Sequence, residues 1–315
     1  MKQVKKYFKM ISPFNNMQEM PGAIYAVKKM LAFLAIYFSA AVLGEAVIIG
    51  GLMAMGYNPL QGDMPTENLA GVVVGLFPYY GFIIFILLTM LYCKLVEKRT
   101  LRSLGFRKPV LDYLIGAVIA VILLAVIMGI CCITGCISFE GMNEEVSYGY
   151  LLALLVGFII QSMGEEILCR GFLMPSLLKK VSVPVAVLVS STAFALPHFT
   201  SFSEMEMKFR VVGILNLYLV SAIFSLLVIY RSNIWGACGL HGVWNFLLYG
   251  VFGLNLSGSE ENAAGVLLFK VEESNILNGG EYGIEASVIT LAVLGVAVVL
   301  AWKYYSRDKS VACER

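Results

Sequence analysis

Histidine is nearly absent from this chain of 315 residues, which contains only two, and charged residues make up only 14% of it. A soluble domain carries about 25% charged and about 45–50% apolar residues, whereas this chain is 59% hydrophobic. Its mean hydropathy of +0.81 is also higher than is typical of a soluble domain. The composition therefore excludes an ordinary soluble domain and predicts a polytopic membrane protein.

Several other features are missing, and each absence removes a class of function. The basic residues form no patch interleaved with aromatic residues, so we do not expect nucleic-acid binding. The seven cysteines include no C-x-x-C pair and fall mostly within or beside apolar stretches, which is typical of small buried residues. The sequence also lacks the H-E-x-x-H pattern of a zinc-binding helix.

Long apolar stretches are plentiful, and a helix needs about 20 residues to cross a bilayer core of about 30 Å. The first follows Lys29 and is too long for the apolar part of a signal peptide, so we expect it to be a retained span. The fourth is too long for one upright span, which predicts a tilt or a kink, with Pro175 as one candidate. The predicted spans are residues 30–56, 70–93, 110–134, 149–178, 183–199, 209–230, 233–253 and 283–303.

The expected fold is therefore an all-α membrane bundle of about eight transmembrane helices. It divides into an N-terminal segment at residues 1–29, the transmembrane domain at residues 30–303 and a tail at residues 304–315. With the N-terminus inside, 19 of the 23 basic residues fall in cytoplasmic segments and three in outer loops. This asymmetry predicts an even number of spans with both termini cytoplasmic. We separately expect the protein to lie in the plasma membrane. The longest outer loop, about residues 254–282, is interpreted as a solvated connector, with a lid as the alternative.

Ionisable side chains inside a span are costly, so each one is a candidate for function. Glu166 and Arg170 are four residues apart and share a helix face, which favours a structural ion pair. Glu165 points roughly 100° away from Glu166 on a helix and has no evident partner on its own segment. An unpaired carboxylate at this depth is a candidate general base.

Both histidines also lie in predicted spans. His198 directly follows Pro197, and His241 shares a helix face with Asn245, four residues further on. The simpler alternatives are a histidine at the outer interface for His198 and a polar clamp between helices for the other pair. At 1.5 Å per residue, both histidines, Asn245 and Glu165 reach similar depths in the bilayer, so they can meet in one site.

These residues form three motifs, Glu165-Glu166-x-x-x-Arg170, Phe194-x-x-x-His198 and His241-x-x-x-Asn245. In this order they resemble the motifs of the CPBP family, which includes the CAAX prenyl endopeptidases of the Rce1 type and the bacterial Abi, or bacteriocin self-immunity, proteins. The resemblance implies a family core at about residues 149–253 and an intramembrane endopeptidase. Its partners would be the lipid bilayer and a membrane-associated or lipidated protein or peptide substrate.

Two chemistries are compatible with this resemblance. In glutamate-type hydrolysis, which needs no cofactor, Glu165 and His198 activate a water, and His241 and Asn245 stabilise the oxyanion. In a zinc-dependent metalloprotease, Glu165, His198 and His241 would bind the metal. Asn245 is a poor zinc ligand, and this favours the first alternative.

Two rival functions stay open at this point. One is a non-catalytic immunity or scaffold protein, in which the motifs hold helices together. The other is a transporter, although its usual paired halves are not evident in this sequence. The sequence predicts neither the identity of the substrate nor the oligomeric state.

Overall fold

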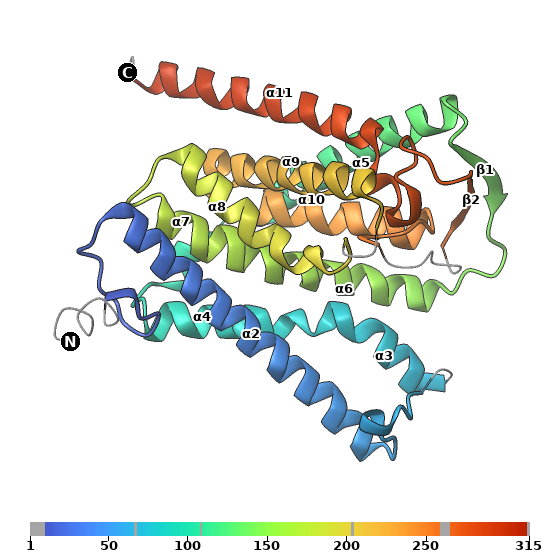
Figure 1. Ribbon diagram of the computed structural model, residues 1–315, viewed down its shortest axis with the longest axis horizontal. Helices are drawn as coiled ribbons and strands as arrows, with labels where there is room; N and C mark the ends of the chain where they lie inside the picture. The colour runs from blue at the N-terminus through green and yellow to red at the C-terminus, as the bar shows by residue number, and fades with distance from the viewer. Residues whose placement is uncertain (1–9, 66–67, 108, 203–204, 259–264, 314–315) are drawn as a thin grey trace.

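The computed structural model describes residues 10–65, 68–107, 109–202, 205–258 and 265–313. Most of its long helices run along one axis, and a two-stranded antiparallel sheet lies at one end of the bundle (Figure 1). Its helices are α2 (Gly22–Ala54), α3 (Asn68–Tyr80), α4 (Phe82–Leu95), α5 (Pro109–Ile133), α6 (Tyr148–Glu166), α7 (Met174–Leu177), α8 (Val183–Ala195), α9 (Met207–Arg231), α10 (Trp235–Asn245) and α11 (Val288–Cys313). The strands are β1 (Ile137–Met142) and β2 (Leu267–Val271).

The predicted all-α membrane bundle is confirmed, and each predicted span contains helix. Helix α2 begins at Gly22, inside the segment assigned to the N-terminus, and α11 continues to Cys313, into the predicted tail. Among the described residues, five helices are long and apolar enough to cross a membrane by themselves: Gly22–Ala54, Gly71–Leu95, Val110–Ile133, Tyr148–Leu177 and Met207–Arg231. The number of eight spans stays a prediction, because α8 and α11 offer only shorter apolar helices and α10, in the seventh predicted span, is not among the candidate membrane helices.

The outward face of α5 is an exposed apolar surface of the bundle. Large aliphatic side chains are exposed along the whole helix, while other residues of α5, such as Leu124 and Ile127, are fully buried. Apolar side chains left uncovered on this scale indicate a surface that faces lipid. The exposed residues are Val110, Leu111, Leu114, Val118, Val121, Ile122, Val126, Ile130 and Ile133.

Small residues allow α10 to pack closely against α5. A Cβ atom added to Gly239 would lie 2.1 Å from the backbone oxygen of Tyr113, and one added to Gly116 would lie 2.0 Å from the backbone oxygen of Gly236. Such close approach of two backbones is typical of helix pairs in membranes. Because α10 carries His241 and Asn245, this contact fixes the height and rotation of two candidate site residues.

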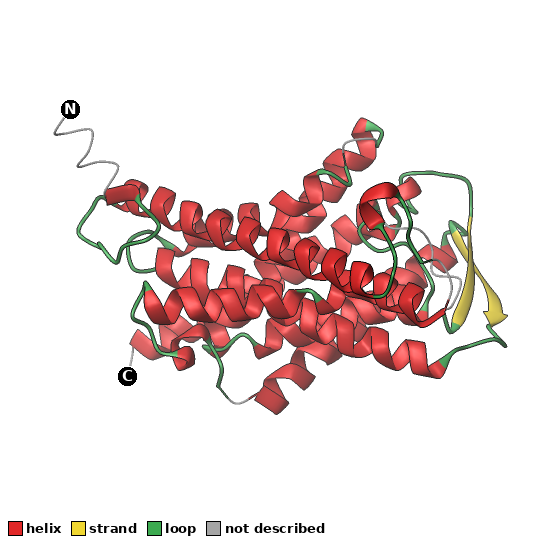
Figure 2. Ribbon diagram, turned by 90° about the horizontal axis from the view of Figure 1, so that it is seen from below, coloured by secondary structure: helices red, strands yellow, loops and turns green. Residues whose placement is uncertain are grey.

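The two ends of the bundle differ in structure, with ion pairs at one end and the two-stranded sheet at the other. Helix α2 begins and α11 ends at the same end, and the sheet lies at the opposite end, as both views show (Figure 2). Ion pairs join segments at the first end, where Lys29 contacts Glu97 and Arg231 contacts Asp112. The sheet end lies where the charge pattern predicts the outer face, although this assignment to membrane sides is still a prediction.

The close contact between α5 and α10 gives the first testable prediction. We expect Gly239→Ala to lower the free energy of unfolding by roughly 1–3 kcal/mol, because the added methyl group overpacks the interface. Thermal unfolding in detergent measures this change. Gly129→Ala, on the exposed side of α5 where an added Cβ meets nothing within 4 Å, is the matched control and should not destabilise the protein. Equal stability of the two variants would contradict the packing argument.

Candidate active site

Each motif lies where an α-helix changes its geometry. Helix α6 ends at Glu166 and continues as a π-helix over Ile167–Leu173, and α10 ends at Asn245 and continues as a π-helix over Phe246–Val251. His198 belongs to a 3-10 helix, Leu196–Phe199, that extends α8. Short π-helical segments are rare and often mark functional sites. The break in α6 precedes Pro175, which lies in the first turn of α7.

Glu166 and Arg170 form a fully buried ion pair. The Nη1 atom of Arg170 donates to Oε1 of Glu166 at 2.9 Å, and neither side chain is exposed. The guanidinium also donates to the backbone oxygen of Ser221, 3.2 Å away, and lies over the rings of Phe194 and Phe224, whose centroids are 4.6 and 5.2 Å away. A buried ion pair needs such additional partners, because both charges have lost their water.

His241 joins this cluster from α10. Its Nδ1 atom lies 3.2 Å from the same Glu166 oxygen that accepts from Arg170, and its ring stacks on Phe224 with centroids 5.1 Å apart. A carboxylate can only accept a hydrogen bond, so Nδ1 of His241 donates and Nε2 is left for other partners. Glu166 therefore orients the histidine ring as well as neutralising Arg170. The sequence did not reveal this contact, because it joins two helices that are 75 residues apart.

Glu165 does have a partner, in contrast to the interpretation of the sequence. The Nε2 atom of Gln161, one helical turn earlier, donates to Oε1 of Glu165 at 3.3 Å. The side-chain oxygen of Gln161 accepts from Nδ2 of Asn245 at 3.4 Å. Gln161 thus links the carboxylate of α6 to the amide of α10. Its spacing of four residues from Glu165 is the signal that could have identified it.

His198 is held by its own segment. Its Nδ1 atom lies 3.1 Å from the backbone oxygen of Phe194, which can only accept a hydrogen bond. Nδ1 therefore carries the hydrogen, and in the neutral ring Nε2 is an acceptor. This tautomer is the one that a histidine needs to receive a proton from water.

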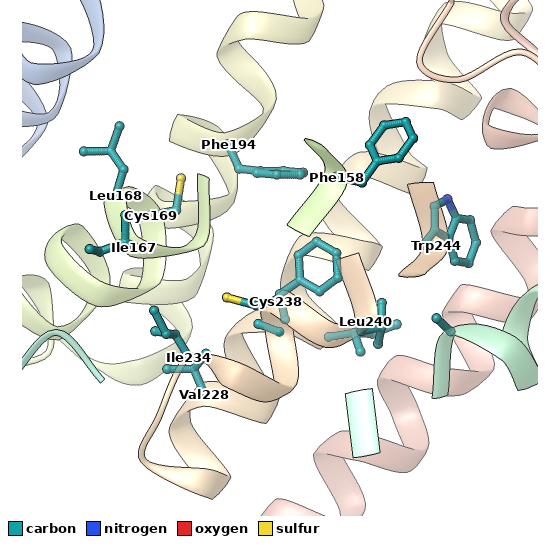
Figure 3. Packing of buried hydrophobic residues seen from close by; sticks show 14 of the residues in the cluster. Phe158, Ile167, Leu168, Cys169, Phe194, Val228, Ile234, Cys238, Leu240 and Trp244 are labelled. Carbon is teal, nitrogen blue, oxygen red and sulfur yellow. The ribbon is translucent and has the colours of Figure 1, made fainter. Parts of the chain in front are cut away.

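One cavity of about 200 Å³ collects the candidate residues. Glu165, His198, His241 and Asn245 all line it, together with Gln161. Phe194 and Trp244, which also line it, are drawn in Figure 3 among the buried apolar residues that surround the site. His241 and Asn245 are each 6% exposed, whereas Glu165 and His198 are partly exposed, so buried and partly exposed polar groups converge in this cavity.

The zinc-dependent alternative requires Glu165, His198 and His241 to form a metal-binding group. Within the described parts of the chain, no group of three or more histidine, cysteine, aspartate or glutamate side chains is arranged to hold a metal ion. Glu165, His198 and His241 line the same cavity but do not form such a group. The arrangement of these three side chains therefore does not fit a bound metal ion.

The fold and the cavity define the class of protein, an integral membrane protein of helical architecture with polar groups converging inside its bundle. Residues 147–247, about a third of the chain, match the family model described as "Type II CAAX prenyl endopeptidase Rce1-like". The resemblance of the three motifs to this family is thereby confirmed, and all of their residues lie in the matched segment. A search of curated proteins found no match.

The buried ion pair gives the second prediction. Glu166→Gln leaves Arg170 buried without its counter-charge, which should lower the free energy of unfolding by roughly 3–5 kcal/mol. Chemical unfolding in detergent measures the loss. Replacing both partners, as Glu166→Gln with Arg170→Met, should recover part of it.

Glu206→Gln is the matched control for this prediction, because its ion pair with Lys208 is exposed. Removing an exposed partner should change the stability by no more than about 1 kcal/mol. A Glu166→Gln variant as stable as this control would show that Arg170 does not depend on Glu166.

Proposed function

We propose that this protein is an intramembrane endopeptidase that hydrolyses a peptide bond of a membrane-associated protein or peptide by glutamate-type chemistry. The observation that carries the proposal is the convergence of Glu165, His198, His241 and Asn245, from three helical segments, on one cavity. The match of residues 147–247 to the Rce1-like family supports the reaction class. The roles of the individual residues are our own inference.

In this mechanism Glu165 and His198 activate the water molecule. Glu165 accepts one hydrogen bond from Gln161, which leaves its carboxylate further acceptor positions for a water molecule. His198 offers its free Nε2 to the same cavity. The water oxygen attacks the carbonyl carbon of the peptide, and its proton passes to Glu165, which returns it to the departing amine. General base catalysis of this kind contributes about 10²–10⁴-fold in rate.

In this mechanism His241 and Asn245, which lie one turn apart on α10, stabilise the oxyanion. Glu166 and Gln161 hold them in place from α6, through Nδ1 of His241 and Nδ2 of Asn245. For His241 to donate through Nε2, its ring must carry hydrogens on both nitrogens, because Nδ1 faces a carboxylate. Donors fixed in advance stabilise developing negative charge more than mobile water can.

The third prediction tests the base. Glu165→Gln keeps the size of the side chain but removes the proton acceptor, so turnover should be lost while thermal unfolding stays close to that of the wild type. The measurement compares new peptide termini in membranes that contain the wild type with those that contain the variant. Peptides produced only by the wild type identify the substrate.

Glu45→Gln is the matched control for this substitution, because Glu45 is an exposed carboxylate on another membrane helix, α2. Membranes with this variant should yield the same cleaved peptides as the wild type. Full activity of a folded Glu165→Gln protein would overturn the proposed mechanism. If neither the wild type nor the variant yields new peptide termini and both keep the protein's effect on the cell, the non-catalytic immunity or scaffold function is favoured instead.

The fourth prediction concerns the metal. If Glu165 and His198 activate water directly, the purified protein should contain far less than one zinc ion per chain and retain turnover in the presence of chelators. His241→Ala should lower turnover by roughly 10²–10³-fold, as expected for the loss of one oxyanion donor. Stoichiometric zinc that disappears in both His198→Ala and His241→Ala would instead establish a metalloprotease.

A further inference from the structure

The cavity contains a second carboxylate, Glu285, which the proposed mechanism does not use. Glu285 belongs to the short 3-10 helix Ile284–Ala286, which precedes α11, and it lines the same cavity as Glu165. This helix lies beyond the residues that match the family model, so the match assigns Glu285 no role. Its side chain is partly exposed. A polar group in the wall of such a cavity is a candidate for binding part of the substrate.

Neutral donors hold the carboxylate of Glu285 in place. The indole Nε1 of Trp244 donates to Oε1 at 2.9 Å, and the backbone nitrogen and hydroxyl of Ser257 donate to Oε2 at 2.7 and 3.2 Å. Both oxygens accept, which is the hydrogen-bond pattern of an ionised carboxylate. Among the described residues, no basic side chain forms an ion pair with Glu285. The cavity wall therefore carries a negative charge without a counter-ion.

An unsatisfied acceptor lies beside Glu285. Asn216 on α9 is 3% exposed and lines the same cavity. Its Nδ2 atom donates to the backbone oxygens of Glu285 and Ser287 at 2.9 and 3.0 Å, which fixes the orientation of the amide. Its Oδ1 atom is buried and has no hydrogen-bond partner in the described part of the chain. A buried acceptor without a donor is costly, and a donor on a bound ligand would remove this cost.

The cavity also offers apolar walls, which Leu217, Val220, Leu256 and Leu294 provide. Lysine and arginine side chains combine a long aliphatic stem with a cationic head that carries several N–H donors and no acceptor. Such a side chain can place its stem against the apolar walls and its donors at the two acceptors. A neutral side chain would leave the carboxylate without a counter-charge, and an acidic side chain would be repelled.

We propose that Glu285 and Asn216 form a subsite for a lysine or arginine side chain of the peptide substrate. Trp244, which contacts Glu285, is next to the oxyanion donor Asn245 in the chain, so the cationic residue lies close to the cleaved bond. This inference rests on the proposed endopeptidase function for the reaction, and it adds the class of side chain that the substrate carries.

Binding of a small cation tests the subsite without using activity. The probes are butylguanidinium chloride and butylurea, which have similar shapes, although only the first is charged. Thermal unfolding of the purified protein in detergent is followed at equal ionic strength, adjusted with sodium chloride. We expect butylguanidinium to raise the unfolding temperature of the wild type, because a ligand that binds the folded state stabilises it. Butylurea should not raise it. Equal shifts with both probes, or no shift with either, would overturn the inference.

Three variants locate the bound cation. Glu285→Gln keeps an oxygen for Trp244 but removes the charge, so butylguanidinium should no longer raise the unfolding temperature. Glu281→Gln is the matched control, because Glu281 is an exposed carboxylate four residues earlier, and it should keep the shift. Glu165→Gln should also keep it. A shift that is lost in Glu165→Gln and kept in Glu285→Gln would place the cation at the catalytic carboxylate and overturn the inference.

The sequences of the cleaved peptides test the substrate class. New peptide termini that depend on Glu165 should carry lysine or arginine within a few residues of the cleaved bond more often than membrane proteins do on average. Glu165-dependent termini without this enrichment would overturn the inference and leave the proposed function intact. Absence of any Glu165-dependent termini would contradict the proposed function, while the butylguanidinium result would still decide the subsite.

A pair of synthetic peptides separates substrate binding from a structural role of Glu285. One peptide carries the cationic residue of a cleaved sequence, and the other carries norleucine at that position. Glu285→Gln should lower kcat/KM for the cationic peptide roughly ten- to hundredfold, because a charge-assisted hydrogen bond is lost, and should change it little for the norleucine peptide. An equal loss for both peptides would indicate that Glu285 only ties Ser257 to Trp244, and would overturn the inference.

Discussion

The burial of Arg170 is the constraint on which the site depends. A guanidinium with no exposed surface inside a membrane bundle must be surrounded by partners, and these come from several elements: Glu166 from α6, Ser221 and Phe224 from α9, and Phe194 from α8. Through Glu166 the cluster also reaches His241 on α10. Because the buried guanidinium of Arg170 needs these partners, its contacts connect the helices that carry all three motifs.

Much of the helical framework could be predicted from the sequence, because hydrophobic length and helical spacing are local properties. The pairing of Glu166 with Arg170 follows from a separation of four residues on a helix. That Glu165 and the two histidines line one cavity could be anticipated from depth alone. Charge asymmetry likewise predicts an orientation without any knowledge of packing.

Other features depend on how the helices rotate and pack, which spacing does not determine. The contact of His241 with Glu166 and the bridge from Glu165 through Gln161 to Asn245 both cross between α6 and α10. Their formation depends on how closely α10 packs into the bundle, which the glycines on that helix permit. The pairing of β1 with β2 and the contact of Trp244 with Glu285 could not be predicted from the sequence either, because the residues are far apart in the chain and join through tertiary hydrogen bonds.

We propose that Glu165 and His198 activate the water and that His241 and Asn245 stabilise the oxyanion, and a tetrahedral analogue tests this proposal most directly. The measurement is an experimental structure of the protein bound to a peptide in which a phosphinate replaces the scissile bond. We expect one phosphinate oxygen to lie within hydrogen-bond distance of Nε2 of His241 and Nδ2 of Asn245, and the other to face Glu165 and His198. A phosphinate bound to a metal ion, or bound away from these four side chains, would contradict it.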